Sequence, residues 1–212
     1  DETAKKYKNA TTWDVSARGD KSILAWYETN TNGSVKVYIG SDAEIFANQD
    51  STDLFAYVGY SSKCTSTETI TNINLLNVTY VTNMKRMFRG TGYNAMTKLD
   101  LGNTFDTSNV TNMCAIFEQT GYKAMTAFNL GGNFSTSKVT DMTYMFNACG
   151  HDKLESLNLG NKFDTSKVTN MKYMFNQTGY TAMETLTLGS NFDTSAVTDM
   201  YGMFAGVGQV SP

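Results

Sequence analysis

The sequence predicts an α/β repeat fold, in which short parallel strands and short helices alternate along a solenoid of stacked coils behind an N-terminal β-hairpin cap. Three observations lead to this prediction. A phrase recurs every 29 residues along most of the 212-residue chain. Within each copy, the spacing of apolar residues changes from alternation, typical of a strand, to helical spacing. Residues 1–75 lack methionine and carry a hairpin signal instead.

The repeat is defined by the string VTxM, which is followed in constant register by a phenylalanine and preceded by FDTS or a variant of it. Because a unit of 29 residues cannot bury its apolar side chains alone, such units are expected to stack and share a core. All twelve methionines fall inside the repeat, where flexible thioethers fill gaps between larger side chains. The repeated valines are Val81, Val110, Val139, Val168 and Val197, and the phenylalanines are Phe88, Phe117, Phe146, Phe175 and Phe204.

Each copy is expected to contain one strand and one helix. Leu99 and Leu101 alternate with polar residues before Gly102, which predicts a short strand with one buried face. Further along, apolar residues at i, i+3, i+6 and i+7 predict a short helix, with N-cap candidates at 106–108 and Gly121 at its end. These apolar residues are Val110, Met113, Ile116 and Phe117.

Two domains are predicted: a β-rich N-terminal cap at 1–54, and the solenoid at 55–212, with a degenerate first coil. In the cap, β-rich runs at 23–27 and 35–39 flank Asn32-Gly33, a pair that favours a type I′ hairpin turn. Residues 206–212 offer no evident cap. We therefore expect an array that is truncated C-terminally, with self-association through the uncapped coil of Met203 and Phe204 as one consequence.

Composition narrows the classes of function. The net charge of -3 and the pI near 5.2 argue against nucleic acid as a partner, because phosphate binding needs a basic surface. No run approaches the roughly 18 apolar residues of a membrane helix, so no membrane insertion is expected within this segment. No pair of carboxylates forms a recognisable hydrolytic site, so we expect no enzyme activity.

Metal and cofactor sites are not expected either. His151 is the only histidine, which rules out a multi-histidine metal site. Cys64, Cys114 and Cys149 lack metal-ligand spacing, and the sequence allows either three reduced thiols or one bridge and a free thiol. A column of aspartates admits a calcium interpretation, but Ser135 interrupts it and helix N-capping accounts for it without an ion. The aspartates are Asp106, Asp164 and Asp193.

The phrase LxxLxLGNxFDTSxVTxMxxMF resembles the surface repeat of the BspA-type leucine-rich-repeat group, a domain of unknown function in mycoplasmas and Gram-positive bacteria. The N-terminal phrases WDVS, AWYE and DSTDLF are similar to the leader that precedes such repeats, so the resemblance covers residues 13–204. It implies a leucine-rich-repeat-like solenoid on a secreted or wall-anchored bacterial protein, often associated with adhesion. It implies no catalytic residue. The coils here are longer than is usual in that group.

Three sets of side chains are candidates for ligand binding. The first is an aromatic ladder, which either binds a ligand or only packs against itself: Tyr93, Tyr122 and Tyr180, with His151 in the fourth place. The second contains tyrosines at less regular positions, which we favour as recognition residues: Tyr80, Tyr144, Tyr173 and Tyr201. The third is the outward face of the strands: Lys98, Asp100, Ala127, Asn129, Ser156, Asn158, Thr185 and Thr187.

Two short motifs that contain basic residues are weaker candidates for binding sites. Lys85, Arg86 and Arg89 form a dense cluster that is more typical of a solvated edge than of a phosphate site. The triplet at 18–20 spells RGD, which resembles an integrin ligand but is also ordinary turn chemistry.

The leading hypothesis is therefore a non-enzymatic, extracellular module on a bacterial cell surface or in secreted form. It would bind a protein or glycan of a host or neighbouring cell through its repeat surface. Two alternatives remain open: a structural spacer or stalk that displays another domain, and a glycan-binding module that uses the aromatic ladder.

Overall fold

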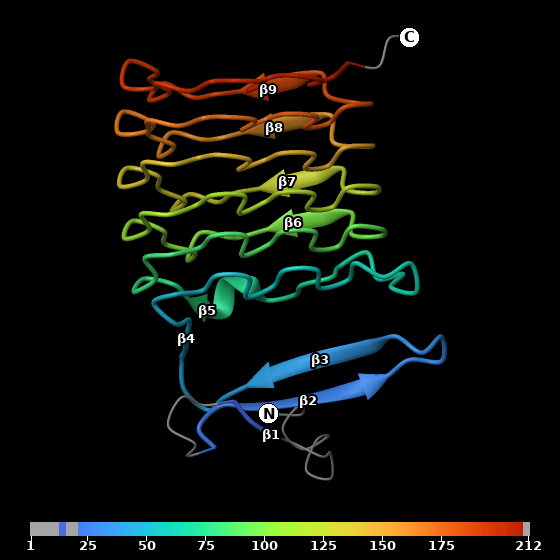
Figure 1. Cartoon of the computed structure of the whole chain (residues 1–212). Coiled ribbons are helices and arrows are strands. Elements are labelled where there is room, and N and C mark those ends of the chain that lie inside the picture. The colour runs from blue at the N-terminus through green and yellow to red at the C-terminus, as the bar shows by residue number, and fades with distance from the viewer. Residues whose placement is uncertain (1–12, 16–20, 210–212) are drawn as a thin grey trace. The chain divides into compact units, whose positions relative to one another are not determined.

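The computed structural model of the chain describes residues 13–15 and 21–209. The chain divides into two compact units, Asp1–Ile45 and Phe46–Pro212. Figure 1 shows a hairpin in the first unit and a stack of thin layers in the second. Among the described residues, no helix has the length and apolarity needed to cross a membrane.

The first unit contains an antiparallel sheet with the strand order β1-β2-β3: Trp13–Asp14, Leu24–Thr29 and Val35–Gly40. The Asn30 N–H donates to the Ser34 carbonyl at 2.8 Å, which closes a three-residue loop between β2 and β3. Within this loop Gly33 alone has a positive φ, of 78°. A type I′ turn requires positive φ at both central residues, so that prediction is wrong and the loop belongs to the three-residue class.

The second unit is built from one layer per copy of the repeat, and neighbouring layers pair in parallel. An isolated bridge joins the same position of each pair of successive layers, from Asp50 to Asn83 and onward to Asp199. Strands β6 (Lys98–Asp100) and β7 (Ala127–Asn129) pair in parallel, as do β8 (Ser156–Asn158) and β9 (Thr185–Thr187). The remaining elements are β4 (Ile45–Phe46), its partner β5 (Leu76–Asn77), and the 3-10 turn η1 (Ile73–Leu75).

The predicted fold class, an α/β solenoid of leucine-rich-repeat type with short helices, is wrong. The described residues contain no α-helix, and their regular structure is limited to short strands in separate two-stranded and three-stranded sheets. The strand expected around Leu99 is present as β6, but turns replace the expected helix around Val110 and Phe117.

We call residues 83–92, and their equivalents in other layers, the turn segment. From residue 84 to residue 90, alternate N–H groups donate to carbonyls in the next layer, at 2.7–2.9 Å. Between and after them, the N–H groups of Met87, Arg89 and Thr91 donate three residues back, Met87 to Met84 at 3.1 Å. An α-helix would instead bind each N–H four residues back, so the turn segment replaces local bonds with bonds between layers. The donors are Met84, Arg86, Phe88 and Gly90, and the acceptors are Asn112, Cys114, Ile116 and Glu118.

The turn segment requires left-handed backbone at repeated places. Arg86, Gly90 and Gly92 have φ values of 57°, 63° and 61°, and the same spacing recurs in the other layers. Several of these positions hold residues other than glycine, although this conformation costs an L-residue about 1–2 kcal/mol. They include Ala115, Gln119, Tyr144, Ala148, Tyr173 and Gln177. The bonds between layers hold the chain in this conformation against its local preference.

The core consists of side-chain columns that run across the layers. One column is a stack of phenylalanines with successive ring centroids 5.4–5.5 Å apart. Methionines such as Met84, Met87 and Met96 are fully buried beside it. Unbranched thioethers adapt to the gaps between flat rings, which explains their number here. The column contains Phe55, Phe88, Phe117, Phe146, Phe175 and Phe204.

Buried threonines tie the layers together through their hydroxyl groups. Thr120 Oγ1 donates to the Phe88 carbonyl at 2.7 Å, and Thr178 Oγ1 donates to the Phe146 carbonyl at the same distance. Cys149 occupies the equivalent place in the layer between them and is completely buried. Burial raises the pKa of the Cys149 thiol, so this side chain stays neutral and offers at most a weak donor.

Replacing Cys149 with Thr is expected to stabilise the protein. The new hydroxyl would donate to the Phe117 carbonyl as its neighbours do one layer away, a gain of about 1 kcal/mol. Thr120→Val, which removes an existing bond of this kind, is the matched control and is expected to lose a similar amount. Urea unfolding of the three proteins measures the difference, and an unchanged or lowered midpoint for Cys149→Thr would contradict it.

Replacing Ala148 with Gly is also expected to stabilise the fold, by about 0.5–1 kcal/mol, because φ is 53° there and glycine adopts it without strain. Gly90 and Gly206 already occupy the equivalent position in other layers. Ala124→Gly, at a position without positive φ, is expected to destabilise by a similar amount. Thermal unfolding of both variants tests this, and equal losses would show that left-handed strain is absent at Ala148.

Candidate binding surfaces

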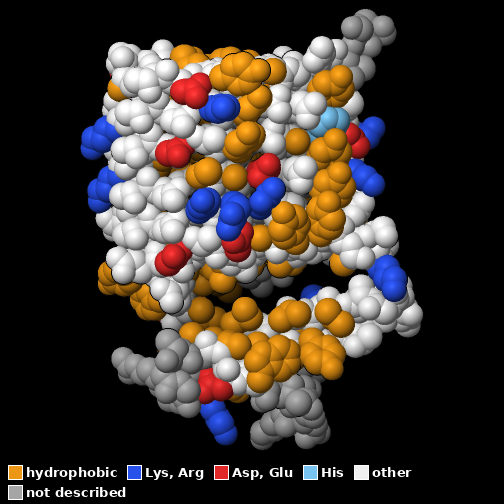
Figure 2. All heavy atoms as spheres, in the orientation of Figure 1, with side chains coloured by type: hydrophobic (Ala, Val, Ile, Leu, Met, Phe, Trp, Pro, Cys, Tyr) orange, Lys and Arg blue, Asp and Glu red, His pale blue; other side chains and the backbone are white. Residues whose placement is uncertain are grey.

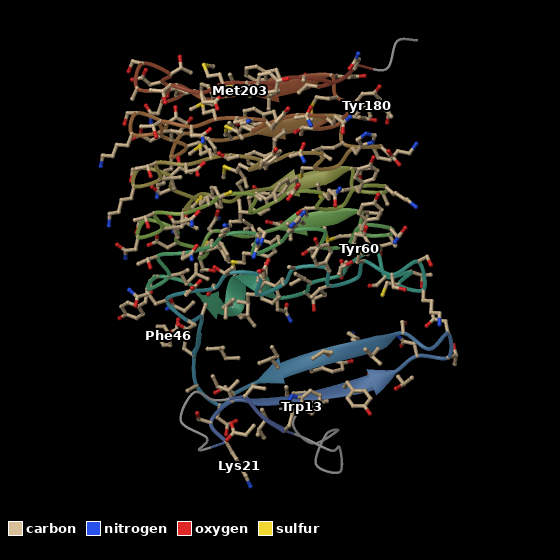
Figure 3. The ribbon with its side chains drawn as sticks, in the orientation of Figure 1. Trp13, Lys21, Phe46, Tyr60, Tyr180 and Met203 are labelled. Atoms are coloured by element: carbon tan, nitrogen blue, oxygen red, sulfur yellow. The ribbon has the colours of Figure 1, made fainter. Side chains whose placement is uncertain are left out.

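The aromatic ladder expected from the sequence forms on one side of the second unit. The rings of Tyr60, Tyr93, Tyr122, His151 and Tyr180 follow one another at centroid distances of 4.3–4.9 Å. Figure 2 shows the imidazole within a column of apolar side chains across the layers, and Figure 3 places Tyr60 and Tyr180 on the same side. Each inner ring has a neighbour on both faces, so a sugar could stack only at the ends of the ladder.

The phenols of the ladder are not activated as acids or nucleophiles. Burial raises the pKa of Tyr93 and of Tyr122, so both phenols stay neutral well above physiological pH. His151 Nδ1 lies 2.6 Å from Asp152 Oδ1, which fixes the orientation of the ring. Sequence reasoning missed Tyr60 as a member, because extra residues near Cys64 shift it out of the 29-residue register. The likeness of residues 55–60 to 88–93 was the signal that could have found it.

A second aromatic cluster, which we call the tyrosine patch, consists of Tyr144, Tyr173, Tyr201 and Lys172. Tyr144 stacks on Tyr173 at 5.2 Å, and Tyr201 meets Tyr173 edge-on at the same distance. Lys172 Nζ lies 5.8 Å from the centroid of Tyr173 and 5.5 Å from that of Tyr201. Tyr201 is 66% exposed, so aromatic area and positive charge meet here at the surface.

The backbone under the tyrosine patch is strained. Tyr144 and Tyr173 have φ values of 58° and 55°, where bulky residues are unusual. Gly202 holds the equivalent position one layer on, and a Cβ there would lie 2.5 Å from the Tyr173 ring. Asp53, Arg86 and Ala115 hold this left-handed position in the earlier layers, so the conformation belongs to the turn segment and the position accepts different side chains.

Only some of the predicted strand-face residues contact one another. Lys98 Nζ lies 3.0 Å from Asp100 Oδ2, and Asn129 Nδ2 donates to Asp100 Oδ1 at 2.9 Å. Asn158 lies in the other two-stranded sheet, where its side-chain oxygen accepts the Gly160 N–H. The hydrogen bond from Lys98, with help from the Gly102 N–H, lowers the pKa of Asp100.

The basic cluster is engaged in ion pairs between layers. Arg86 binds Asp53 through two hydrogen bonds, at 2.9 and 2.6 Å. Arg89 Nε lies 2.9 Å from Glu118 Oε2. Both arginines of the cluster are therefore paired with carboxylates of neighbouring layers.

The aspartate column serves the backbone. The carboxylates of Asp106, Asp164 and Asp193 each accept the N–H two residues further on, at 2.8–2.9 Å. These bonds lower the pKa of Asp164 and of Asp193. The predicted side-chain capping bonds are present, but they close Asx turns and begin no helix.

The remaining candidates add no further site. In the part of the chain that the structure describes, no group of three or more His, Cys, Asp or Glu could hold a metal ion. Cys64, Cys114 and Cys149 are free thiols. The RGD triplet at 18–20 lies outside the described residues.

These features define a repeat protein whose layers are held by turns and short parallel strands. Residues 58–158 and 150–211 match the family described as "Mycoplasma protein of unknown function, DUF285". The matched segments cover more than half of the chain, and the chain belongs to this family. A search of curated proteins found no match, and a search of solved structures found none.

Replacing Asp100 with Asn tests the electrostatics of the strand face. Because the folded pKa of Asp100 is depressed, its charge stabilises the fold above the unfolded pKa near 4 and loses that effect as pH falls through the folded value. The Lys98 and Asp100 side chains are 56% and 38% exposed, so the loss at pH 7 is expected to stay below about 1 kcal/mol. It should be smaller at pH 3, because the unfolded carboxyl is then mostly protonated.

Urea unfolding at both pH values measures this effect. Asparagine is a fair replacement because Asn129 and Asn158 make the same turn bond in their layers. A loss that is equal at the two pH values would show that the ion pair contributes nothing.

Proposed function

We propose that this chain is a non-enzymatic, extracellular binding module that attaches a bacterial cell to a protein of a host or neighbouring cell. The observation that carries the proposal is the tyrosine patch. Tyr144 and Tyr173 stack on each other and lie beside Lys172 and Tyr201, and Tyr201 is 66% exposed. Tyrosine next to a cation is typical of protein contact sites, because a rigid ring offers large area at low entropy cost.

The family supports this proposal at a coarser level. Membership of a Mycoplasma repeat family is compatible with a surface protein, and the repeated phrase resembles that of BspA-type surface proteins. We propose a relation to that group through the repeated sequence alone, since the fold expected from it is not the one observed. A position on the cell surface, or secretion, is part of the same proposal.

The two alternatives differ in what supports them. Glycan binding along the ladder is disfavoured, because the inner ring faces of Tyr93, Tyr122 and His151 are covered by their neighbours. A spacer that binds nothing is consistent with the dense bonding between layers. It gives no role to the exposed ring of Tyr201 beside Lys172.

Attachment of beads coated with the full chain to cultured animal cells tests the proposal. Replacing Tyr144, Tyr173 and Tyr201 together with Asn, which tolerates left-handed backbone, is expected to reduce attachment at least about tenfold. Tyr57→Asn removes a tyrosine that is 47% exposed and also has left-handed backbone, and it serves as the matched control, with attachment nearly unchanged.

Treatment of the cells identifies the class of partner. Protease digestion of the cell surface should abolish attachment, whereas periodate oxidation of glycans should not. The reverse pattern would favour a glycan partner. If uncoated and coated beads attach equally, the chain is a spacer and the proposal is wrong.

A further inference from the structure

Between β6 and β9, the parallel pairing of strands is interrupted at the junction of β7 with β8. These two strands lie in successive layers of the stack (Figure 1), but they belong to separate sheets, β6-β7 and β8-β9. The turn segments of the same two layers are bonded to each other, as the Phe117 N–H donates to the Met145 carbonyl at 2.9 Å. The junction is therefore closed on the turn side and open on the strand side.

A hydrogen bond that is present at the neighbouring junctions is missing at this one. The Leu101 N–H donates to the Asn129 carbonyl at 3.0 Å. The Leu159 N–H donates to the Thr187 carbonyl at the same distance. Leu130 holds the equivalent position between them, and its N–H makes no such bond within the described part of the chain.

The opposite strand of the junction shows the same loss. The Ala127 N–H donates to the Thr97 carbonyl at 3.2 Å, and the Thr185 N–H donates to the Glu155 carbonyl at 3.1 Å. The Ser156 N–H, at the equivalent position, has no carbonyl partner among the residues that the structure describes. Ala127 and Ser156 are both exposed, so water solvates this edge in place of a carbonyl.

The glycines at the ends of the strands give independent evidence for the separation. A Cβ on Gly131 would lie 1.8 Å from the Gly102 carbonyl oxygen, and a Cβ on Gly189 would lie 2.6 Å from the Gly160 carbonyl oxygen. A Cβ on Gly160 would meet no atom within 4 Å. The backbones of successive layers therefore approach closely at the first two places and stay apart at the third.

A phenylalanine in a column of leucines explains the separation. The Phe128 ring meets Phe117 of its own layer edge-on, with centroids 4.8 Å apart, and meets Phe146 of the next layer at 6.2 Å. It therefore lies across the junction, where a larger side chain in a close-packed core forces its neighbours apart. The equivalent residues of the other layers are Leu99, Leu157 and Leu186.

From these observations we infer that the junction of β7 with β8 is a hinge within the second unit. The turn segments and the stacked phenylalanines hold the two layers together on one side, and the strands separate and approach on the other. This motion changes the curvature of the strand face. It also moves the tyrosine patch as one body relative to the layers before the junction, because Tyr144, Lys172, Tyr173 and Tyr201 all follow it along the stack.

Amide hydrogen exchange of the full chain, measured residue by residue with NMR, tests whether the strands are open. The Leu130 and Ser156 amides are expected to exchange at least about tenfold faster than the bonded amides of Leu101 and Ala127 at the equivalent positions. Relaxation dispersion tests the motion, because it reports exchange between conformations on the microsecond to millisecond timescale. We expect dispersion at Leu130 and Ser156.

Replacing Phe128 with Leu restores the side chain of the other layers and is expected to close the hinge. Exchange at Leu130 and Ser156 should then slow to within about threefold of Leu101 and Ala127, and the dispersion should disappear. Phe105→Leu also removes one ring from the core, in a different column, and is the matched control. It is expected to leave the Leu130 and Ser156 amides in fast exchange.

Three results would overturn the inference. If the Leu130 and Ser156 amides are as protected in the unaltered chain as those of Leu101 and Ala127, β7 and β8 are paired in solution. If these amides exchange fast but show no dispersion, the junction is a fixed gap and not a hinge. If they stay fast in a folded Phe128→Leu protein, the ring does not hold the strands apart.

Discussion

Hydrogen bonds between the turn segments of successive layers are the interaction on which the second unit depends. Each layer presents N–H groups at alternate residues to carbonyls of the next, as Met84, Arg86 and Phe88 do at 2.9 Å. From the second layer onward these bonds recur with the 29-residue period, while the first layer makes the same bonds although extra residues near Cys64 lengthen it. These bonds also impose left-handed backbone at repeated positions. A turn segment whose N–H groups point towards the next layer cannot have right-handed backbone at every residue. The stacked phenylalanines and the threonine hydroxyl bonds follow from the resulting register.

Because of these bonds, some side chains hold the layers together, and others are available for contact with a partner. Asparagine and aspartate are abundant because they close Asx turns, and threonine is abundant because its hydroxyl group connects layers. These structural roles account for residues that would otherwise suggest metal or glycan sites. The two aromatic clusters divide in the same way. The ladder through Tyr122 and His151 is stacked face to face along its length, whereas the tyrosine patch ends at Tyr201, which is 66% exposed and meets Tyr173 edge-on. Our proposal assigns recognition to the second cluster.

The candidate sites were predictable to different degrees. The ladder of Tyr93, Tyr122, His151 and Tyr180 was predictable from the period alone, because identical positions in stacked repeats must adjoin. Tyr60 was not, since an insertion displaces it from the register. The tyrosine patch could be named only as irregular tyrosines. The contact of these tyrosines with Lys172 depends on the direction in which the turns point the side chains. Sequence spacing does not give this direction.

The sequence by itself determined the repeat, the core columns, the short strand around Leu99 and the hairpin strands of the first unit. Tertiary structure decided that the apolar segment from Val110 to Phe117 is a run of turns and not a helix. Successive turns with bonds three residues back place apolar side chains at the same i, i+3 spacing as a short helix, so the local pattern is ambiguous. The choice is made by acceptors that lie a whole layer away along the chain, and these reach the donors only once the layers are in contact.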